Sequence, residues 1–311
     1  MREKFTDNPF TETEKEKMRK YAEEAVFLAS GGESEVFEFE NRPNIVAKIS
    51  SKHYRPHQDF YEYESSREYD KERLKQLHEH AEKEQKLFND FKSYFGNHTL
   101  AQRRNVIKIP TAKLPKNGAL YRELAMFYDN NNENNIPTWI WVNSSIQRKV
   151  DTTDAQDIIS VNSGYLDREK RLAEFEYICA EDTKFKEALK DFVSRAMEYT
   201  INTGMMVDLV GRNNVVFLKK DSNWDYKIID GFFPYEPEEF VKSAEVGNSP
   251  LLYNLDHYRE LIKALAHLVG LEDKLKLFLE KYDYNPISAP AYKNWVYRSR
   301  GIFLDQTRTV A

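Results

Sequence analysis

The sequence predicts an α+β protein with an antiparallel sheet in its first half and mainly helices in its second. Residues 26–50 alternate apolar and polar side chains around a pair of glycines, which is typical of two or three strands joined by tight turns. Residues 70–95 place their apolar side chains on roughly one face of a single long helix. Helical patterns predominate further along the chain. We therefore predict an N-terminal helix, the sheet and the long helix in residues 1–150, and a helical lobe in residues 151–311.

The remaining pattern of the first half adds one helix, one loop and two strands. Residues 11–25 have the charge pattern of an amphipathic helix, and the polar, tyrosine-rich residues 51–69 indicate a long loop. Residues 119–129 and 138–150 are strand-like runs separated by an asparagine-rich tract, which indicates a turn or loop. The two strands would complete the antiparallel sheet.

The second half alternates helices with one compact β segment. Residues 167–180 and 183–203 have helical spacing, and Gly204 interrupts the second helix. In residues 215–229 two apolar runs flank the polar turn Lys-Lys-Asp-Ser-Asn-Trp-Asp, which predicts a β-hairpin. Residues 254–282 predict one or two further helices.

Composition excludes several classes of protein. The 311 residues are 41% hydrophobic and 31% charged, as expected of a globular chain with a sizeable core. A net charge of −5 provides no general attraction to nucleic acid or anionic lipid. No apolar run approaches the roughly 20 residues that span a bilayer. We therefore expect a cytoplasmic protein that binds neither nucleic acid nor membrane. The single cysteine, Cys179, lies in an apolar stretch and is expected to be a small buried residue.

The first motif is a loop of small residues followed by a strand that carries a lysine. Small residues let backbone N–H groups approach phosphate oxygens closely. A valine just after such a loop can cover an adenine ring, and a lysine on the next strand is well placed to contact phosphates. Alone, the loop also fits an ordinary hairpin turn, but its spacing to the lysine favours a nucleotide site. The candidate residues are Gly31, Gly32, Glu33, Ser34, Val36 and Lys48.

A carboxylate on the long helix is the second candidate, because a buried lysine near phosphates needs a negatively charged partner. Glu84 lies at the edge of the apolar face, where it can turn toward Lys48. Glu79 and Glu82 are its rivals, and each of the three also fits a solvated helix surface.

The third motif is an aspartate, then an asparagine that opens a strand, then an aspartate that ends the paired strand. These are Asp208, Asn214 and Asp230. A hairpin brings Asn214 and Asp230 together at its open end, where two oxygen-bearing side chains can hold Mg²⁺. Asp208 can orient a hydroxyl or accept its proton during phosphoryl transfer. A polar-capped hairpin without a ligand is the alternative.

The order of these features is similar to that of the protein-kinase family. That family has a glycine-rich loop, a strand lysine, a helix glutamate, a hinge, a D-x-x-x-x-N catalytic loop and a D-F-G metal aspartate. The matching residues here are Lys48, Glu84, the hinge segment from Gln147 to Val150, Asp208, Asn214 and Asp230. The resemblance covers about residues 26–235 and is greatest to atypical bacterial kinase-like proteins, including those of mobile elements and phage.

The resemblance implies a two-lobed protein-kinase-like fold that binds ATP and Mg²⁺. It implies that Lys48 contacts the α- and β-phosphates and pairs with Glu84, while Gln147 and Val150 border the adenine. The γ-phosphate would pass to a hydroxyl of an acceptor, which is either a protein or a small molecule. The sequence does not distinguish the two.

Some departures from the family pattern leave alternatives open. Met206 and Val207 precede Asp208, where the family has histidine and arginine. Asn213 has the family's spacing, whereas Asn214 has the better register with the apolar strand. Gly-Phe, not Phe-Gly, follows Asp230, and no A-P-E segment is evident. A pseudokinase that binds nucleotide or protein is therefore the second hypothesis, and an unrelated α+β protein is the third.

Overall fold

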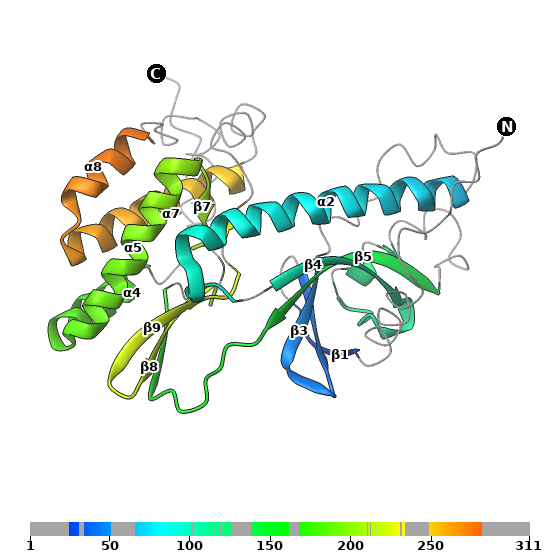
Figure 1. Ribbon diagram of the computed structural model, residues 1–311, viewed down its shortest axis with the longest axis horizontal. Coiled ribbons are helices and arrows are strands. Elements are labelled where there is room, and N and C mark those ends of the chain that lie inside the picture. Colours follow the sequence, from blue (N-terminus) through cyan, green and yellow to red (C-terminus); the bar gives the residue numbers. More distant parts are fainter. Residues whose placement is uncertain are drawn as a thin grey trace, which may run out of the picture. The chain divides into compact units, whose positions relative to one another are not determined.

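The computed structural model describes residues 25–30, 34–50, 66–100, 102–118, 120–122, 124–125, 138–161, 168–209, 211, 213–230, 232–233 and 249–281. The chain divides into two compact units (Figure 1). Unit 1 consists of Met1–Leu87 and Leu100–Asp151, and unit 2 of Phe88–Thr99 and Thr152–Ala311. Residues 11–24 of the predicted N-terminal helix and the glycine pair of the loop lie outside the described residues, and Ala25, the last residue of that prediction, belongs to a strand.

Unit 1 contains a five-stranded antiparallel sheet. Its strands are β1 (Ala25–Ser30), β2 (Ser34–Phe39), β3 (Arg42–Ser50), β4 (Gln102–Pro110) and β5 (Trp139–Arg148). They are arranged in the order β1-β2-β3-β5-β4, and each neighbouring pair is antiparallel. The chain is thus a mixed α+β protein with an antiparallel sheet, as predicted. Strand β4 was not expected from the sequence.

One face of this sheet packs against a helical segment that the sequence analysis placed in a strand. Residues 120–122 and 124–125 are helical, so the prediction of a strand at 119–129 was wrong there. Leu120 and Leu124 are fully buried and join the apolar cluster formed by Phe37, Ala47 and Ile49. Two leucines four residues apart share one face of a helix, so helical spacing suits this contact better than a strand's alternation.

The opposite face of the sheet is covered by the long helix α2 (Ser66–Phe95). Leu77 and Ala81 of α2 are buried against Val106 of β4, and Trp141 of β5 packs on the same cluster. Figure 1 shows this part of α2 running along β4 and β5. The helix begins at Ser66, inside the predicted loop, and ends at the predicted Phe95.

A fully buried carboxyl lies on the face opposite α2. Glu35 of β2 accepts a hydrogen bond at Oε1 from the backbone N–H of Leu120, 3.1 Å away. Its Oε2 has no hydrogen-bond partner among the described residues. A Cβ on Gly118 would lie 2.1 Å from Oε1, so the absence of a side chain at Gly118 is what leaves room for the carboxyl. Burial raises the pKa of Glu35, although the Leu120 N–H lowers it in part.

We expect Glu35→Gln to become progressively more stable than the unaltered protein as the pH rises. The raised pKa means that ionisation of Glu35 opposes folding, so its cost is absent well below pH 4.5, grows as the pH rises from there to the folded-state pKa, and is constant above it. Glutamine carries no such charge. Urea unfolding at pH 5, 6, 7 and 8 should show a relative gain on the order of 1 kcal/mol at the upper end. Glu40→Gln, at an exposed turn, is the matched control. A pH-independent difference would contradict the expectation.

Unit 2 is built around helix α5 (Thr183–Thr203), which contacts the helices of residues 168–181, 249–269 and 272–281 and the strands of residues 206–207 and 223–228. Asp182 caps the start of α5 by accepting hydrogen bonds from the N–H groups of Lys184 and Phe185, and Gly204 ends it with a φ of 75°. The predicted helices are confirmed, and the last predicted stretch is two helices. Their bounds are α4 (Arg168–Glu181), α5 (Thr183–Thr203), α7 (Ser249–Val269) and α8 (Glu272–Lys281).

The β segment of unit 2 forms two small antiparallel sheets. Strands β8 (Val215–Lys220) and β9 (Asn223–Ile228) form the predicted hairpin, and β6 (Asp157–Ser160) pairs with β8. The turn is shorter than predicted, because Asp221 and Ser222 have φ of 49° and 66°, which suits a tight two-residue turn. Strands β7 (Met206–Val207) and β10 (Phe232–Phe233) form the second sheet.

The capping residue of α5 also attaches this hairpin to the helix. Asp182 Oδ2 accepts hydrogen bonds from the Trp224 indole at 2.8 Å and from Lys219 Nζ at 2.9 Å. The bond from Trp224, together with that from Lys219, lowers the pKa of Asp182 to about 2. The start of α5 and the β8–β9 hairpin are therefore held together by one ionised carboxylate.

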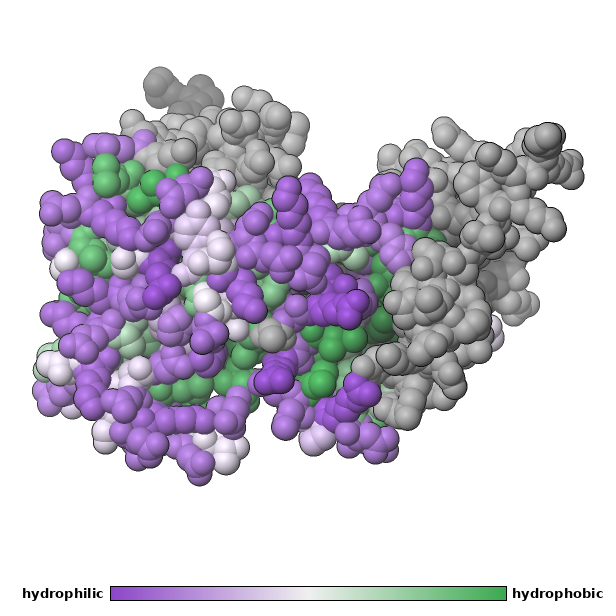
Figure 2. All heavy atoms as spheres, in the orientation of Figure 1, coloured by the Kyte–Doolittle hydropathy of each residue, from purple (hydrophilic) through white to green (hydrophobic). Residues whose placement is uncertain are grey.

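The described surface is largely polar. Hydrophilic side chains predominate on the face shown in Figure 2. Within the described ranges, every helix is too short or too polar to cross a bilayer. Cys179 is buried, as predicted, and burial raises the pKa of its thiol to about 11.

Candidate functional site

The candidate lysine lies in the middle of the unit 1 sheet. Lys48 of β3 is paired with Val36 of β2 on one side and with Ser145 of β5 on the other. Ser145 is in turn paired with Arg104 of β4. Directly opposed residues of antiparallel strands project from the same face of a sheet, so these four side chains form one row. Val36 and Lys48, which were predicted to act together, are therefore neighbours on one face.

Helix α2 covers the face on which this row lies. Val106, which packs against the helix, is two residues beyond Arg104 and so projects from the same face. The backbone N–H of Arg104 donates a hydrogen bond to Gln85 Oε1 of the helix at 2.8 Å. The sheet and α2 thus bring Glu84 to the face that carries Lys48.

Glu84 itself is held by two basic side chains. Its Oε2 lies 3.4 Å from Nη1 of Arg104, and its Oε1 lies 3.2 Å from Nε2 of His80, one turn earlier in α2. The Glu84 and Arg104 side chains are 16% and 17% exposed, so the pair is largely shielded from water. Arg104 was not anticipated, because nothing in the sequence indicates that β4 lies beneath the helix. Glu79, one of the rivals, is 64% exposed and lies 3.9 Å from Lys75.

We expect Glu84→Gln to lower the free energy of unfolding by about 1–2 kcal/mol. Stability falls because removing the charge leaves a shielded Arg104 without its counter-ion. The loss lies between the values typical of exposed and of buried ion pairs because this pair is largely, but not fully, shielded from water. Urea denaturation checks it. Glu79→Gln on the same helix should change stability by less than about 0.5 kcal/mol. Equal effects of the two substitutions would mean that the Arg104 contact contributes nothing.

The remaining candidate nucleotide-binding residues of unit 1 lie at the end of β5 and at or before the start of β2. Gln147 is buried and paired with Val46 and Gln102, and Val150 follows the strand and is half-buried. Ser34 opens β2. Gly31, Gly32 and Glu33 lie outside the described residues.

Unit 2 brings the three residues of the third motif together. Asp208 directly follows β7, and Asp230 comes two residues before β10, which is paired with β7. The backbone carbonyl of Asn214 accepts hydrogen bonds from the N–H groups of Ile229 and Asp230, at 2.7 and 3.4 Å. The Asn214 side-chain Nδ2 donates to the backbone carbonyl of Asp208 at 3.4 Å. The hairpin therefore places Asn214 between the two aspartates.

The loop from Asp208 to Asn214 is closed by its own hydrogen bonds. Asp208 Oδ1 accepts a hydrogen bond from the N–H of Gly211 at 3.0 Å. A Cβ on Gly211 would lie 2.2 Å from Asn214 Nδ2, so only glycine fits here without displacing that amide. Gly211 was not predicted as part of the site, although a glycine within a polar loop was the available signal.

The geometry distinguishes the two asparagines. Asn213 is exposed and has a φ of 60°, a left-handed conformation that asparagine adopts readily in turns. Asn214 is half-buried and directed into the loop beside Asp208. Of the two, Asn214 is therefore the residue placed next to Asp230.

The donor chemistry at this position suits Mg²⁺. Asn214 and Asp230 offer an amide oxygen and a carboxylate, and Mg²⁺ is commonly bound by one or two carboxylates together with substrate phosphates and water. In the part of the chain that the structure describes, no three His, Cys, Asp or Glu side chains gather into a metal site.

Comparisons with protein-family models, with curated proteins and with solved structures found no match to this chain.

Proposed function

We propose that this protein is an ATP- and Mg²⁺-dependent phosphotransferase with a two-lobed, protein-kinase-like fold. The observation that carries the proposal is the grouping of Asp208, Asn214 and Asp230 at one end of the β8–β9 hairpin. In protein kinases a catalytic aspartate, a metal-binding asparagine and a metal-binding aspartate act together. Residues separated in sequence meet here in the order of that family's motifs.

The arrangement of unit 1 supports the same function. In protein kinases the phosphate-binding lysine lies on the third strand and its glutamate on the following helix. Here Lys48 lies on β3, and α2 is the next helix described along the chain. Helix α2, which carries Glu84, covers the face of the sheet from which Lys48 projects.

Each candidate residue has a role in the proposed reaction. Lys48 binds phosphate oxygens and Glu84 orients Lys48. Asp208 holds the acceptor hydroxyl and takes its proton as the γ-phosphate is transferred. Catalysis is then mainly positioning and charge neutralisation. Contacts with the phosphates and the adenine are assigned to Gly31, Gly32, Glu33, Ser34, Val36, Gln147 and Val150.

The metal supplies charge neutralisation when it is bound. Asn214 and Asp230 are the residues that would hold Mg²⁺ against the phosphates. The backbone hydrogen bonds that Ile229 and Asp230 donate to the Asn214 carbonyl hold these two residues in a fixed relation before any ligand binds.

A second candidate is a pseudokinase that binds nucleotide or protein without transferring phosphate. The contact of Glu84 with Arg104 favours it, because a carboxylate engaged by arginine is less available to orient Lys48. The strand residues Met206 and Val207 directly before Asp208 point the same way, since the family's histidine and arginine are absent there.

The test compares ATP binding and turnover in the presence and absence of Mg²⁺. We expect Mg²⁺–ATP to raise the melting temperature and ATP to be consumed only with the metal. Binding without release or transfer of phosphate would favour the pseudokinase. No change in melting temperature, with either ATP alone or Mg²⁺–ATP, would overturn the phosphotransferase and the nucleotide-binding form of the pseudokinase. A screen of protein and small-molecule acceptors with labelled ATP then identifies the substrate class.

A further inference from the structure

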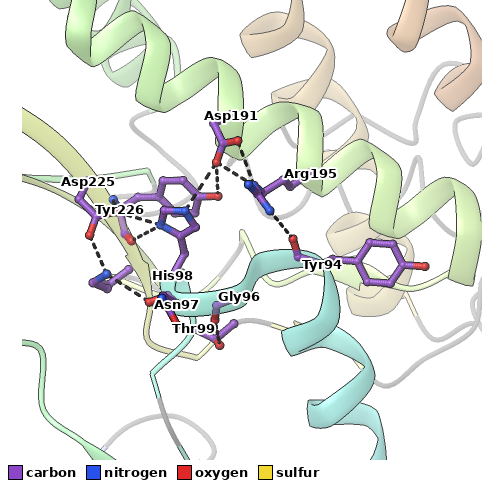
Figure 3. A network of polar contacts seen from close by, with 10 residues as sticks. Tyr94, Gly96, Asn97, His98, Thr99, Asp191, Arg195, Asp225 and Tyr226 are labelled. Carbon is purple, nitrogen blue, oxygen red and sulfur yellow. Dashed lines mark hydrogen bonds and ion pairs between the residues drawn. The ribbon is translucent and has the colours of Figure 1, made fainter.

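A network of polar contacts joins three elements of unit 2 at the C-terminal end of α2 (Figure 3). Arg195 of α5 donates from Nε to both carboxylate oxygens of Asp191, at 2.8 and 3.0 Å. Its Nη1 donates to the backbone carbonyl of Tyr94, in the last turn of α2, at 2.8 Å. A guanidinium on a terminal carbonyl satisfies an acceptor that the helix leaves open. Helix α5 thus caps α2.

The short turn after α2 attaches to strand β9. The ring of His98 is stacked on Tyr226, with centroids 3.9 Å apart and planes 10° from parallel. His98 Nδ1 lies 2.9 Å from Asp225 Oδ1 and 3.3 Å from the Tyr226 carbonyl. Both neighbours are acceptors, so Nδ1 is the nitrogen that carries a proton. Tyr226 in turn donates its hydroxyl to Asp191 at 2.9 Å, which closes the network onto α5.

Lysine and backbone contacts extend this attachment toward the candidate metal site. Lys227 Nζ donates to the carbonyl of Asn97 at 3.2 Å and to Asp225 Oδ2 at 2.6 Å. Thr99 forms a parallel β-bridge with Ile228, whose other neighbour is Val215 of β8. The end of β9, two residues before Asp230, is therefore held from both sides.

The charges of the network are balanced within unit 2. Asp225 is half-exposed, and burial would raise its pKa, yet its hydrogen bonds with His98 and Lys227 lower that pKa to about 2. Asp191 faces Arg195, the Tyr226 hydroxyl and, at 3.7 Å, His98 Nε2. Each carboxylate thus has a basic partner, so the network holds its geometry without an uncompensated charge.

We propose that His98 and Arg195 are positioning residues that hold the exit of β9, and through it Asp230, against Asn214. Together with Asp191, Tyr226 and Thr99 they form a joint between the end of α2, helix α5 and β9. The structural part of the inference stands alone, and its consequence for Mg²⁺ binding rests on the proposed function.

The test removes the His98 ring and follows the amides next to Asn214. In His98→Ala we expect hydrogen exchange at the N–H groups of Ile229 and Asp230 to accelerate about tenfold. The reason is that loss of the ring loosens the β-bridge between Thr99 and Ile228 at the end of β9. The Mg²⁺ concentration needed for half-maximal ATP binding should rise several-fold, while ATP binding at saturating Mg²⁺ changes little. His267→Ala, which replaces a half-exposed histidine of α7 in the same unit, is the matched control.

A milder variant keeps the test decisive if His98→Ala fails to fold. Tyr226→Phe removes only the hydroxyl that donates to Asp191 and should accelerate exchange at the same amides to a smaller extent. Restoration by His98→Gln, which retains a donor group, would support the positioning role. Unchanged exchange at Ile229 and Asp230 in both variants would overturn the inference. Faster exchange in a protein that shows no response to Mg²⁺–ATP would support the joint and reject the proposed function.

Discussion

Replacing Asp230 by asparagine is expected to reduce Mg²⁺-dependent ATP turnover by at least about 100-fold. The substitution keeps the shape of the side chain but removes the one carboxylate of the proposed metal pair. A preorganised charge at a phosphoryl-transfer site is commonly worth about 10²–10³ in rate. Because Asp230 is exposed, its replacement should leave the melting temperature of the unliganded protein nearly unchanged. Turnover at graded Mg²⁺ concentrations, with melting curves alongside, provides the measurement.

The matched control for this prediction is Asp221→Asn, at the opposite end of the same hairpin. Asp221 is exposed and has a φ of 49°, which asparagine also adopts, so this variant should retain full turnover. Asp230→Asn turning over ATP at the rate of the control would contradict the assignment of Asp230. If neither variant nor the unaltered protein turns over ATP but all bind it, the pseudokinase hypothesis gains.

Replacing Phe217 by alanine should have the largest effect on stability, about 3–5 kcal/mol. Phe217 of β8 is fully buried, and its ring lies 5.3–6.4 Å, between centroids, from those of Phe175, Phe185, Phe192 and Tyr226. Removal leaves a cavity among rings that belong to α4, α5 and β9. The change should be visible as a lower midpoint in urea unfolding followed by tryptophan fluorescence.

The neighbouring strand offers the control for Phe217→Ala. Ile158 of β6 is opposite Leu218 of β8 and is 49% exposed, so Ile158→Ala should cost less than about 0.5 kcal/mol. A loss below about 1 kcal/mol for Phe217→Ala would show that the aromatic cluster repacks around the cavity. Since β8 begins directly after Asn214, loosening of this core should also weaken Mg²⁺-dependent ATP binding.

Local patterns in the sequence predicted most elements of the fold. Period-two alternation indicated the early strands, and helical spacing with Gly204 at its end indicated α5, because backbone geometry determines which side chains share a face. The pattern was ambiguous at residues 119–129, where apolar residues are too dense to distinguish a strand from a buried helix. Only the folded backbone shows that residues 120–122 and 124–125 are helical, with Leu120 and Leu124 buried against the sheet.

The residues of the candidate site likewise fall into those that the sequence indicated and those that only the structure revealed. Lys48, Asp208, Asn214 and Asp230 became candidates from their residue type and their spacing along the sequence. Arg104, Gly211, Glu35 and the joint around His98 did not. Their partners lie far away in sequence, as in the pair of His98 with Asp225, and no local pattern records such a contact.

The sequence by itself indicated most of the helices and strands and supplied the candidate side chains for a phosphate or metal site, since both follow from short-range spacing and residue chemistry. Tertiary structure alone decided which of these residues meet: Glu84 with Arg104, Asn214 rather than Asn213 with Asp230, and the end of α2 with β9. The physical reason is that strand pairing and helix packing bring together residues far apart in the sequence, through burial and hydrogen bonding. The energies of these contacts depend on which segments become neighbours, and that is defined only in the folded chain.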